Sequence, residues 1–136
     1  MAVATLLDRI GRLIQAECFT DELPPVQWAA LRCLAQNSAT RQTIGSLAEF
    51  SGVGHSAASR TVAVLVKKGL VTVDPERGPH RSRRIALTQD GWALLERDPL
   101  NKIVEVVASL PQEEKAALHN SLNSLLSRIC ARPDGH

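Results

Sequence analysis

The sequence contains few aromatic residues and no long apolar run. It has two Trp, two Phe and no Tyr. Proteins that bind single-stranded nucleic acid commonly stack bases on aromatic side chains, so this composition argues against that binding mode. No run of about eighteen apolar residues occurs, so no transmembrane helix is predicted. The N-terminal stretch is interrupted by Asp8, Arg9 and Arg12, whereas a signal peptide needs a continuous apolar segment.

Cysteines and catalytic motifs are also sparse. Cys18, Cys33 and Cys130 have no metal-type CxxC spacing, which favours reduced thiols in a cytoplasmic protein. The sequence has no phosphate-binding glycine-rich loop, no nucleophile motif and no carboxylate pair at a catalytic spacing. We therefore expect a protein that is not an enzyme, needs no cofactor and holds no metal.

Positive charge is concentrated in one part of the chain. Segment 51–88 contains seven of the sixteen basic residues and only two acidic ones, in a protein whose total net charge is +2. The remainder of the chain is therefore acidic overall. This asymmetry predicts a polyanionic partner that contacts segment 51–88.

Apolar periodicity predicts a mainly helical chain. From Val3 to Ile14 the apolar residues repeat at offsets of three and four, which indicates an amphipathic helix. A second helix is expected to begin at Pro24-Pro25, because proline suits the first turn. Thr43 is the expected N-cap of a short third helix, in which Gly45 predicts close helix packing.

A fourth helix is predicted from His55 to about Lys68, after a glycine-containing turn at Ser51–Gly54. Three apolar residues at helical spacing define its core face: Ala58, Val62 and Leu65. Lys67 and Lys68 in the last turn, followed by Gly69, are typical of a helix C-terminus.

Two short strands are predicted next, Leu70–Val73 and Arg84–Leu87, joined by an arginine-rich tip at Pro75–Ser82. Thr88 is the expected cap of the following helix, which Pro99 should kink or divide.

A last helix is predicted to start at Pro111. The first and last helices are more apolar along one face than a lone small domain needs, which is typical of a dimerisation layer. Trp28 and Trp92 are expected in the core.

A short helix, a glycine-containing turn and a second helix form the helix-turn-helix pattern. A helix that enters the major groove needs short side chains on its first turns, so that its backbone can approach the bases. The candidate DNA-contacting residues of the second helix are His55, Ser56, Ala57, Ser59 and Arg60.

The arginine-rich ribbon supplies further candidates, Arg77, Arg81 and Arg83, for the minor groove or the DNA backbone. The alternative is that these charges only protect an edge strand from pairing with other chains.

Four segments together resemble the MarR family of winged-helix transcription regulators. They are TIGSLAEFSGVGHSAASRTVAVLVKKGLV (Thr43–Val71), RRIALTQDGWALLE (Arg83–Glu96), PPVQWAALRCLA (Pro24–Ala35) and LPQEEKAAL (Leu110–Leu118). The resemblance extends over essentially the whole chain. It implies a mainly α fold with a small β-ribbon, in which a winged helix-turn-helix lobe is joined to a helical dimerisation layer.

By this resemblance, residues 1–22 form an N-terminal dimerisation helix, residues 23–90 the DNA-binding lobe and residues 91–136 the C-terminal dimerisation helices. The implied protein is a homodimer that binds a pseudo-palindromic operator in double-stranded DNA, and we expect a repressor. Family members often bind small aromatic anions in a crevice beside the lobe. We therefore also expect a small aromatic ligand that weakens DNA binding.

The resemblance places Arg81 where the family usually has the arginine that enters the minor groove. The chain departs from the family at the wing tip, where Pro79-His80-Arg81 replaces Asp-Arg-Arg. Two alternative functions remain. One is a winged-helix module whose basic wing docks on an acidic protein, and the other is a thiol-based redox-sensing regulator, which needs a reactive thiolate.

Overall fold

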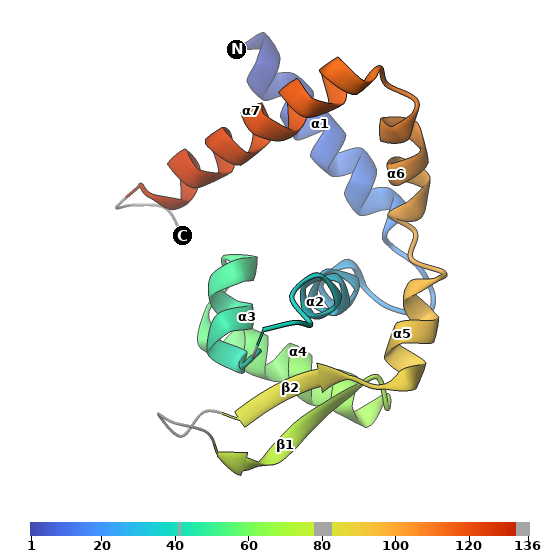
Figure 1. Cartoon of the computed structure of the whole chain (residues 1–136), viewed down its shortest axis with the longest axis vertical. Coiled ribbons are helices and arrows are strands. Elements are labelled where there is room, and N and C mark those ends of the chain that lie inside the picture. Colours follow the sequence, from blue (N-terminus) through green and yellow to red (C-terminus); the bar gives the residue numbers. More distant parts are fainter. Residues whose placement is uncertain (41, 78–82, 133–136) are drawn as a thin grey trace. The chain divides into compact units, whose positions relative to one another are not determined.

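The structure is a computed structural model of the chain, and it describes residues 1–40, 42–77 and 83–132 (Figure 1). The chain divides into two units, Met1–Pro99 and Leu100–His136. The elements of the first unit are α1 (Ala2–Glu17), α2 (Pro25–Gln36), α3 (Ile44–Ser51), α4 (His55–Lys67), β1 (Val71–Arg77), β2 (Arg83–Leu87) and α5 (Gln89–Leu95). The second unit contains α6 (Asn101–Ala108) and α7 (Gln112–Cys130). None of the described helices is both long and apolar enough to span a membrane.

The helix starts follow from local side-chain chemistry. The Thr43 hydroxyl accepts a hydrogen bond from the Ser46 amide at 3.1 Å, and the Ser46 hydroxyl accepts one from the Thr43 amide at 2.8 Å. This reciprocal capping box satisfies two amides that helix geometry leaves without partners. The predicted cap at Thr43 is confirmed, and Thr88 caps α5 in the predicted way by accepting from the Gly91 amide.

The core of the first unit lies between α2, α3, α4 and the hairpin (Figure 1). Trp28 is fully buried there, and its indole nitrogen donates a hydrogen bond to the Thr20 hydroxyl at 3.1 Å. The prediction that Trp28 belongs to the core is confirmed. The same prediction for Trp92 is wrong, because that side chain is 46% exposed on α5.

The β-hairpin is longer than the sequence predicts. β1 and β2 are antiparallel, with Val71 opposite Leu87 and Val73 opposite Ile85. The register then shifts between Val73 and Arg77, and β1 continues to Arg77. The expected tip at Pro75–Ser82 was therefore wrong at its start, because the irregularity accommodates Pro75, which has no amide hydrogen to pair.

Pro99 divides the helical segment that follows the hairpin. Division is one of the two outcomes that the sequence predicts, the other being a kink. α5 ends at Leu95 and α6 begins at Asn101, on either side of the proline. A proline inside a helix removes a backbone hydrogen bond and clashes with the preceding turn, which explains the break.

Gly91 is the glycine that close packing requires. A Cβ atom built on Gly91 would collide with the backbone carbonyl oxygen of Leu70, where α5 approaches the start of β1. The predicted close packing at Gly45 is wrong, because a Cβ there meets only the Thr43 hydroxyl at an ordinary contact distance.

We expect Gly91→Ala to lower the free energy of unfolding by about 2–3 kcal/mol, because backbone atoms must move to admit the methyl group. Gly45→Ala is the matched control, and it should raise stability by up to about 1 kcal/mol because alanine is the better helix former. Urea unfolding at one fixed protein concentration measures both values. Equal stability of wild-type and Gly91→Ala protein would contradict the close approach.

Candidate nucleic-acid interface

The orientation of α4 follows from its buried face. Ala58, Val62 and Leu65 are all buried, as predicted from their spacing. The opposite side of the helix is consequently available to a partner. The structure brings all five predicted α4 residues to the outer part of the helix: His55, Ser56 and Arg60 are exposed, and Ala57 and Ser59 are half-buried.

Arg60 is free to bind an anion. Among the described residues, its guanidinium makes no ion pair and no hydrogen bond. Gly54 caps the start of α4 without a side-chain hydrogen bond, so the first amides of the helix are also open. A helix N-terminus carries a partial positive charge and favours phosphate groups.

The lysines at the end of α4 differ from each other. The Lys68 ammonium donates a hydrogen bond to the Gln27 side-chain oxygen on α2 at 2.7 Å. Lys67 is exposed and has no such partner in the described part of the chain. Sequence inspection missed the Gln27 contact, because 41 residues separate the two positions.

The structure describes some of the predicted wing arginines and not others. Arg83 is exposed at the start of β2, and its backbone lies opposite that of Arg77 at the end of β1. Arg81 and His80 lie outside the described residues. The Ile85 amide donates to the Gln42 carbonyl at 2.8 Å, which fixes the hairpin to the segment before α3.

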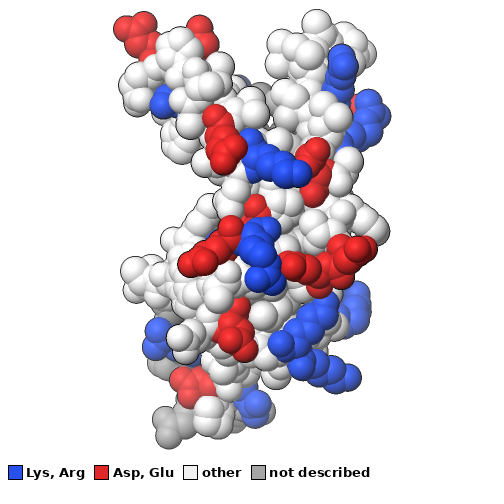
Figure 2. Space-filling model, turned by 90° about the vertical axis from the view of Figure 1, so that its right-hand side faces the viewer, with Lys and Arg blue, Asp and Glu red and all other residues white. Residues whose placement is uncertain are grey.

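Charge on the face shown in Figure 2 is mixed. Basic and acidic side chains both occur there, and several basic side chains lie together at its lower right.

A bidentate ion pair, which sequence analysis did not anticipate, joins α2 to the segment before α6. Arg32 Nε lies 2.6 Å from Asp98 Oδ2, and Arg32 Nη2 lies 2.8 Å from Asp98 Oδ1. Burial lowers the pKa of Arg32, but the hydrogen bonds and charge of Asp98, with a smaller contribution from Cys18, outweigh it and raise the pKa above its ordinary value. Arg32 Nη2 also donates to the Cys18 sulfur at 3.4 Å.

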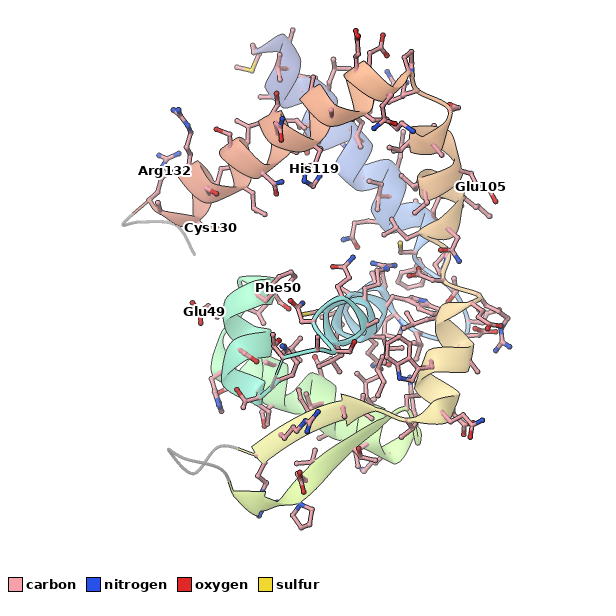
Figure 3. The ribbon with its side chains drawn as sticks, viewed as in Figure 1. Glu49, Phe50, Glu105, His119, Cys130 and Arg132 are labelled. Atoms are coloured by element: carbon pink, nitrogen blue, oxygen red, sulfur yellow. The ribbon has the colours of Figure 1, made fainter. Side chains whose placement is uncertain are left out.

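The thiols are in unequal environments. Cys18 and Cys33 are each 3% exposed, whereas Cys130 is exposed near the end of α7 (Figure 3). Burial raises the pKa of Cys33, although a hydrogen bond from Asn37 opposes this, so its reactive thiolate is disfavoured. Across residues 1–40, 42–77 and 83–132, no group of three His, Cys, Asp or Glu side chains could hold a metal ion.

The hollows in the described part of the first unit include two that α2 helps to line. One, of about 250 Å³, is mainly apolar and is lined by Gln15 of α1 and by residues of α2, α3 and α4 that include Val26, Leu47 and Thr61. The other, of about 190 Å³, has Trp92 and Arg84 in its wall. Trp28 lines neither cavity, so of the two tryptophans only Trp92 is placed to contact a ligand in them.

Comparison with known proteins shows the same architecture. The family model described as the MarR family matches residues 22–82. A MarR-family transcriptional regulator from Silicibacter pomeroyi is 27% identical, with a TM-score of 0.78 over 96% of this chain and 92% of that chain. Residues 22–82 are thus similar to the MarR family, and the fold of the chain is similar to that of this regulator.

Two further solved structures are similar to this chain. Staphylococcus aureus MepR in a DNA-binding conformation has a TM-score of 0.83 at 19% identity, over 93% of this chain and 98% of that chain. Staphylococcus aureus MarR in complex with salicylate and kanamycin has a TM-score of 0.71 at 20% identity, over 94% and 87%. A search of curated proteins finds no match. The mainly helical winged fold expected from the sequence is thus confirmed.

We expect Asp98→Asn to lower the free energy of unfolding by about 3 kcal/mol, because it leaves the partly buried Arg32 without its counter-charge. Glu22→Gln makes the same carboxylate-to-amide change in the exposed pair with Arg97. That control should cost less than about 1 kcal/mol, as exposed pairs do. Urea unfolding compares the two, and equal effects would contradict a structural role for the Arg32–Asp98 pair.

Proposed function

We propose that this protein is a homodimeric, sequence-specific DNA-binding repressor of the cytoplasm that acts by binding rather than by catalysis. The observation that carries the proposal is the outer face of α4, where short polar side chains surround an arginine without a partner in the described chain. The opposite face is fixed in the core, so this face is the one that can enter the major groove.

The first two turns of α4 contribute to base discrimination. Ser56, Ala57 and Ser59 are short enough to let the helix backbone approach the groove floor. Arg60 reaches base edges or phosphates from the same part of the helix, and His55 lies at the open N-terminus, where phosphates are favoured. Phosphate contacts position the helix and base contacts supply the sequence preference.

The wing supplies the second contact. Arg83 is exposed on β2, and Arg77 and Arg81 belong to the same basic segment. The narrow minor groove has an enhanced negative potential that attracts arginine. We propose that at least one of these three arginines enters the minor groove or contacts the adjacent backbone.

The dimer is proposed from uncovered apolar surface at both ends of the chain. α1 exposes Val3, Leu6, Leu7, Ile10 and Leu13, and α7 exposes Leu118, Leu122, Leu125, Leu126 and Ile129. Apolar patches of this extent commonly mark interfaces between proteins. A two-fold dimer would place two α4 helices on half-sites about one duplex turn apart.

A small aromatic ligand is proposed as the effector. The structural relative from Staphylococcus aureus that was solved with salicylate supports this ligand class. The mainly apolar cavity of about 250 Å³ is a candidate site, since it touches α1, α2, α3 and α4. Such a ligand would weaken DNA binding only if it bound the conformation with low DNA affinity more tightly than the conformation that binds DNA.

The two alternative functions have less support. A wing that docks on an acidic protein needs no short polar side chains on α4. A thiol sensor needs a reactive, accessible thiolate, but Cys18 and Cys33 are buried.

We expect the protein to bind DNA from upstream of its own gene far more tightly than a scrambled duplex of equal length. Arg60→Ala should weaken this binding by about ten-fold or more, because contacts of an arginine with a base edge contribute about 1–3 kcal/mol. Arg9→Ala removes the same charge from α1, outside its apolar stripe, and should leave binding unchanged. Fluorescence anisotropy at several salt concentrations measures all three proteins.

Other results would point elsewhere. Weak, equal and steeply salt-dependent binding to both duplexes, and to duplexes from other promoters, would support the protein-docking alternative. Retention of specific binding by Arg60→Ala would remove that residue from the interface.

We expect Ile10→Glu to convert the dimer to a monomer, because the substitution places a charge in the α1 stripe, where Ile10 is 50% exposed in the single chain. Arg9→Glu introduces the same residue next to the stripe and should leave the dimer intact. Sedimentation velocity distinguishes the two species. A dimeric Ile10→Glu variant would show that α1 does not form the interface.

A further inference from the structure

We propose that Val64 and Ala63 on the third turn of α4 form a subsite for the 5-methyl group of thymine, so that each operator half-site contains a thymine read by its methyl. This inference deepens the proposed function and depends on it. It names a base that the chain selects and the side chains that select it.

The first observation is apolar surface on the outer side of α4. Val64 is 37% exposed, and Ala63 beside it is also exposed. Ala63 follows Ser56 by two helical turns, and Val64 follows Arg60 by little more than one. Both residues therefore lie on the same outer face as the proposed DNA-contacting residues, away from the buried Ala58, Val62 and Leu65.

The second observation is the charge on either side of this surface. Arg60 precedes Ala63 and Val64, and Lys67 follows them, each about one turn away on the same face. Neither cation makes an ion pair or hydrogen bond within the described chain. An apolar protein partner would have to remove both charges from water without compensation, which is costly. Duplex DNA offers phosphates to both cations and an apolar group between them.

Thymine supplies that apolar group. In the major groove, the other bases present only hydrogen-bond donors and acceptors, whereas thymine also presents its C5 methyl. Valine and alanine side chains placed against a polar base edge would leave its donors or acceptors without partners. The side chains at positions 63 and 64 therefore favour thymine.

The distance along the helix locates the methyl in the same half-site. From Ser56 to Val64 the helix rises by about 12 Å, at 1.5 Å per residue. Successive base pairs are about 3.4 Å apart, so the thymine lies about three to four base pairs from the first-turn contacts.

Val66 is a matched control residue on the same helix. It is also a valine and is 42% exposed, close to the value for Val64. It follows the buried Val62 by four residues, which places it at the margin of the core face and away from the Arg60–Lys67 side. A general effect of shortening a valine on α4 would appear equally in Val64→Ala and Val66→Ala.

The test begins with duplexes selected from a random library by the full-length wild-type protein. Each thymine of the best duplex is then replaced in turn by deoxyuridine, which removes only the methyl group. Anisotropy is measured for the wild type, Val64→Ala and Val66→Ala. At one thymine in each half-site, deoxyuridine should weaken wild-type binding about four-fold, which corresponds to about 0.8 kcal/mol for one methylene-sized group.

The double comparison identifies the side chain. The deoxyuridine penalty should be clearly smaller in Val64→Ala, which leaves only Ala63 of the original subsite, and should be unchanged in Val66→Ala. A penalty of undiminished size in Val64→Ala would assign the methyl to another residue and overturn the inference. If deoxyuridine has no effect at any position, the inference is also overturned, while specific binding would leave the proposed function intact. Failure to select any duplex would overturn the proposed function itself.

Discussion

The first unit depends on the burial of one face of α4. Val62 and Leu65 are enclosed with Trp28 and Leu31 of α2 in a single apolar cluster. Once that face is fixed, the helix cannot rotate without exposing the cluster to water, at about 25 cal/mol for each Å² of apolar surface. The outer face is thereby fixed as well. The positions of the outer side chains of α4, which we propose contact DNA, are thus a consequence of core packing.

A few specific contacts hold the surrounding segments to this core. The Ile85 amide bonds to the Gln42 carbonyl and so couples the wing to the start of α3. Gly91 lets α5 approach the Leu70 carbonyl more closely than any side chain would allow. Arg32 and Asp98 join α2 to the end of the first unit. The hairpin and the segment at the end of the first unit are therefore both fixed to α2 and α3, the helices that pack against α4.

The described chain leaves much apolar surface without cover on α1 and α7, and α6 exposes Val104 and Val106 as well. By contrast, most of the large apolar side chains of α2, with the exception of Val26, and those of the inner face of α4 are buried. This difference separates the elements that form the core from the helices proposed to form the dimer interface. The proposed DNA-contacting and dimerisation surfaces then lie on different elements.

The sequence by itself determined the order of the elements, most of their boundaries and the outer face of α4, because these depend on local periodicity, capping residues and turn glycines. Thr43, Gly54 and Pro99 each act within a few residues of their own position. The sequence could not show the Arg32–Asp98 pair or the Lys68–Gln27 contact, which join residues 66 and 41 positions apart. It also misplaced Trp92, since burial of a side chain is set by what the rest of the chain packs against it. The tertiary structure decided these features because they arise from contacts between distant segments, which no local pattern encodes.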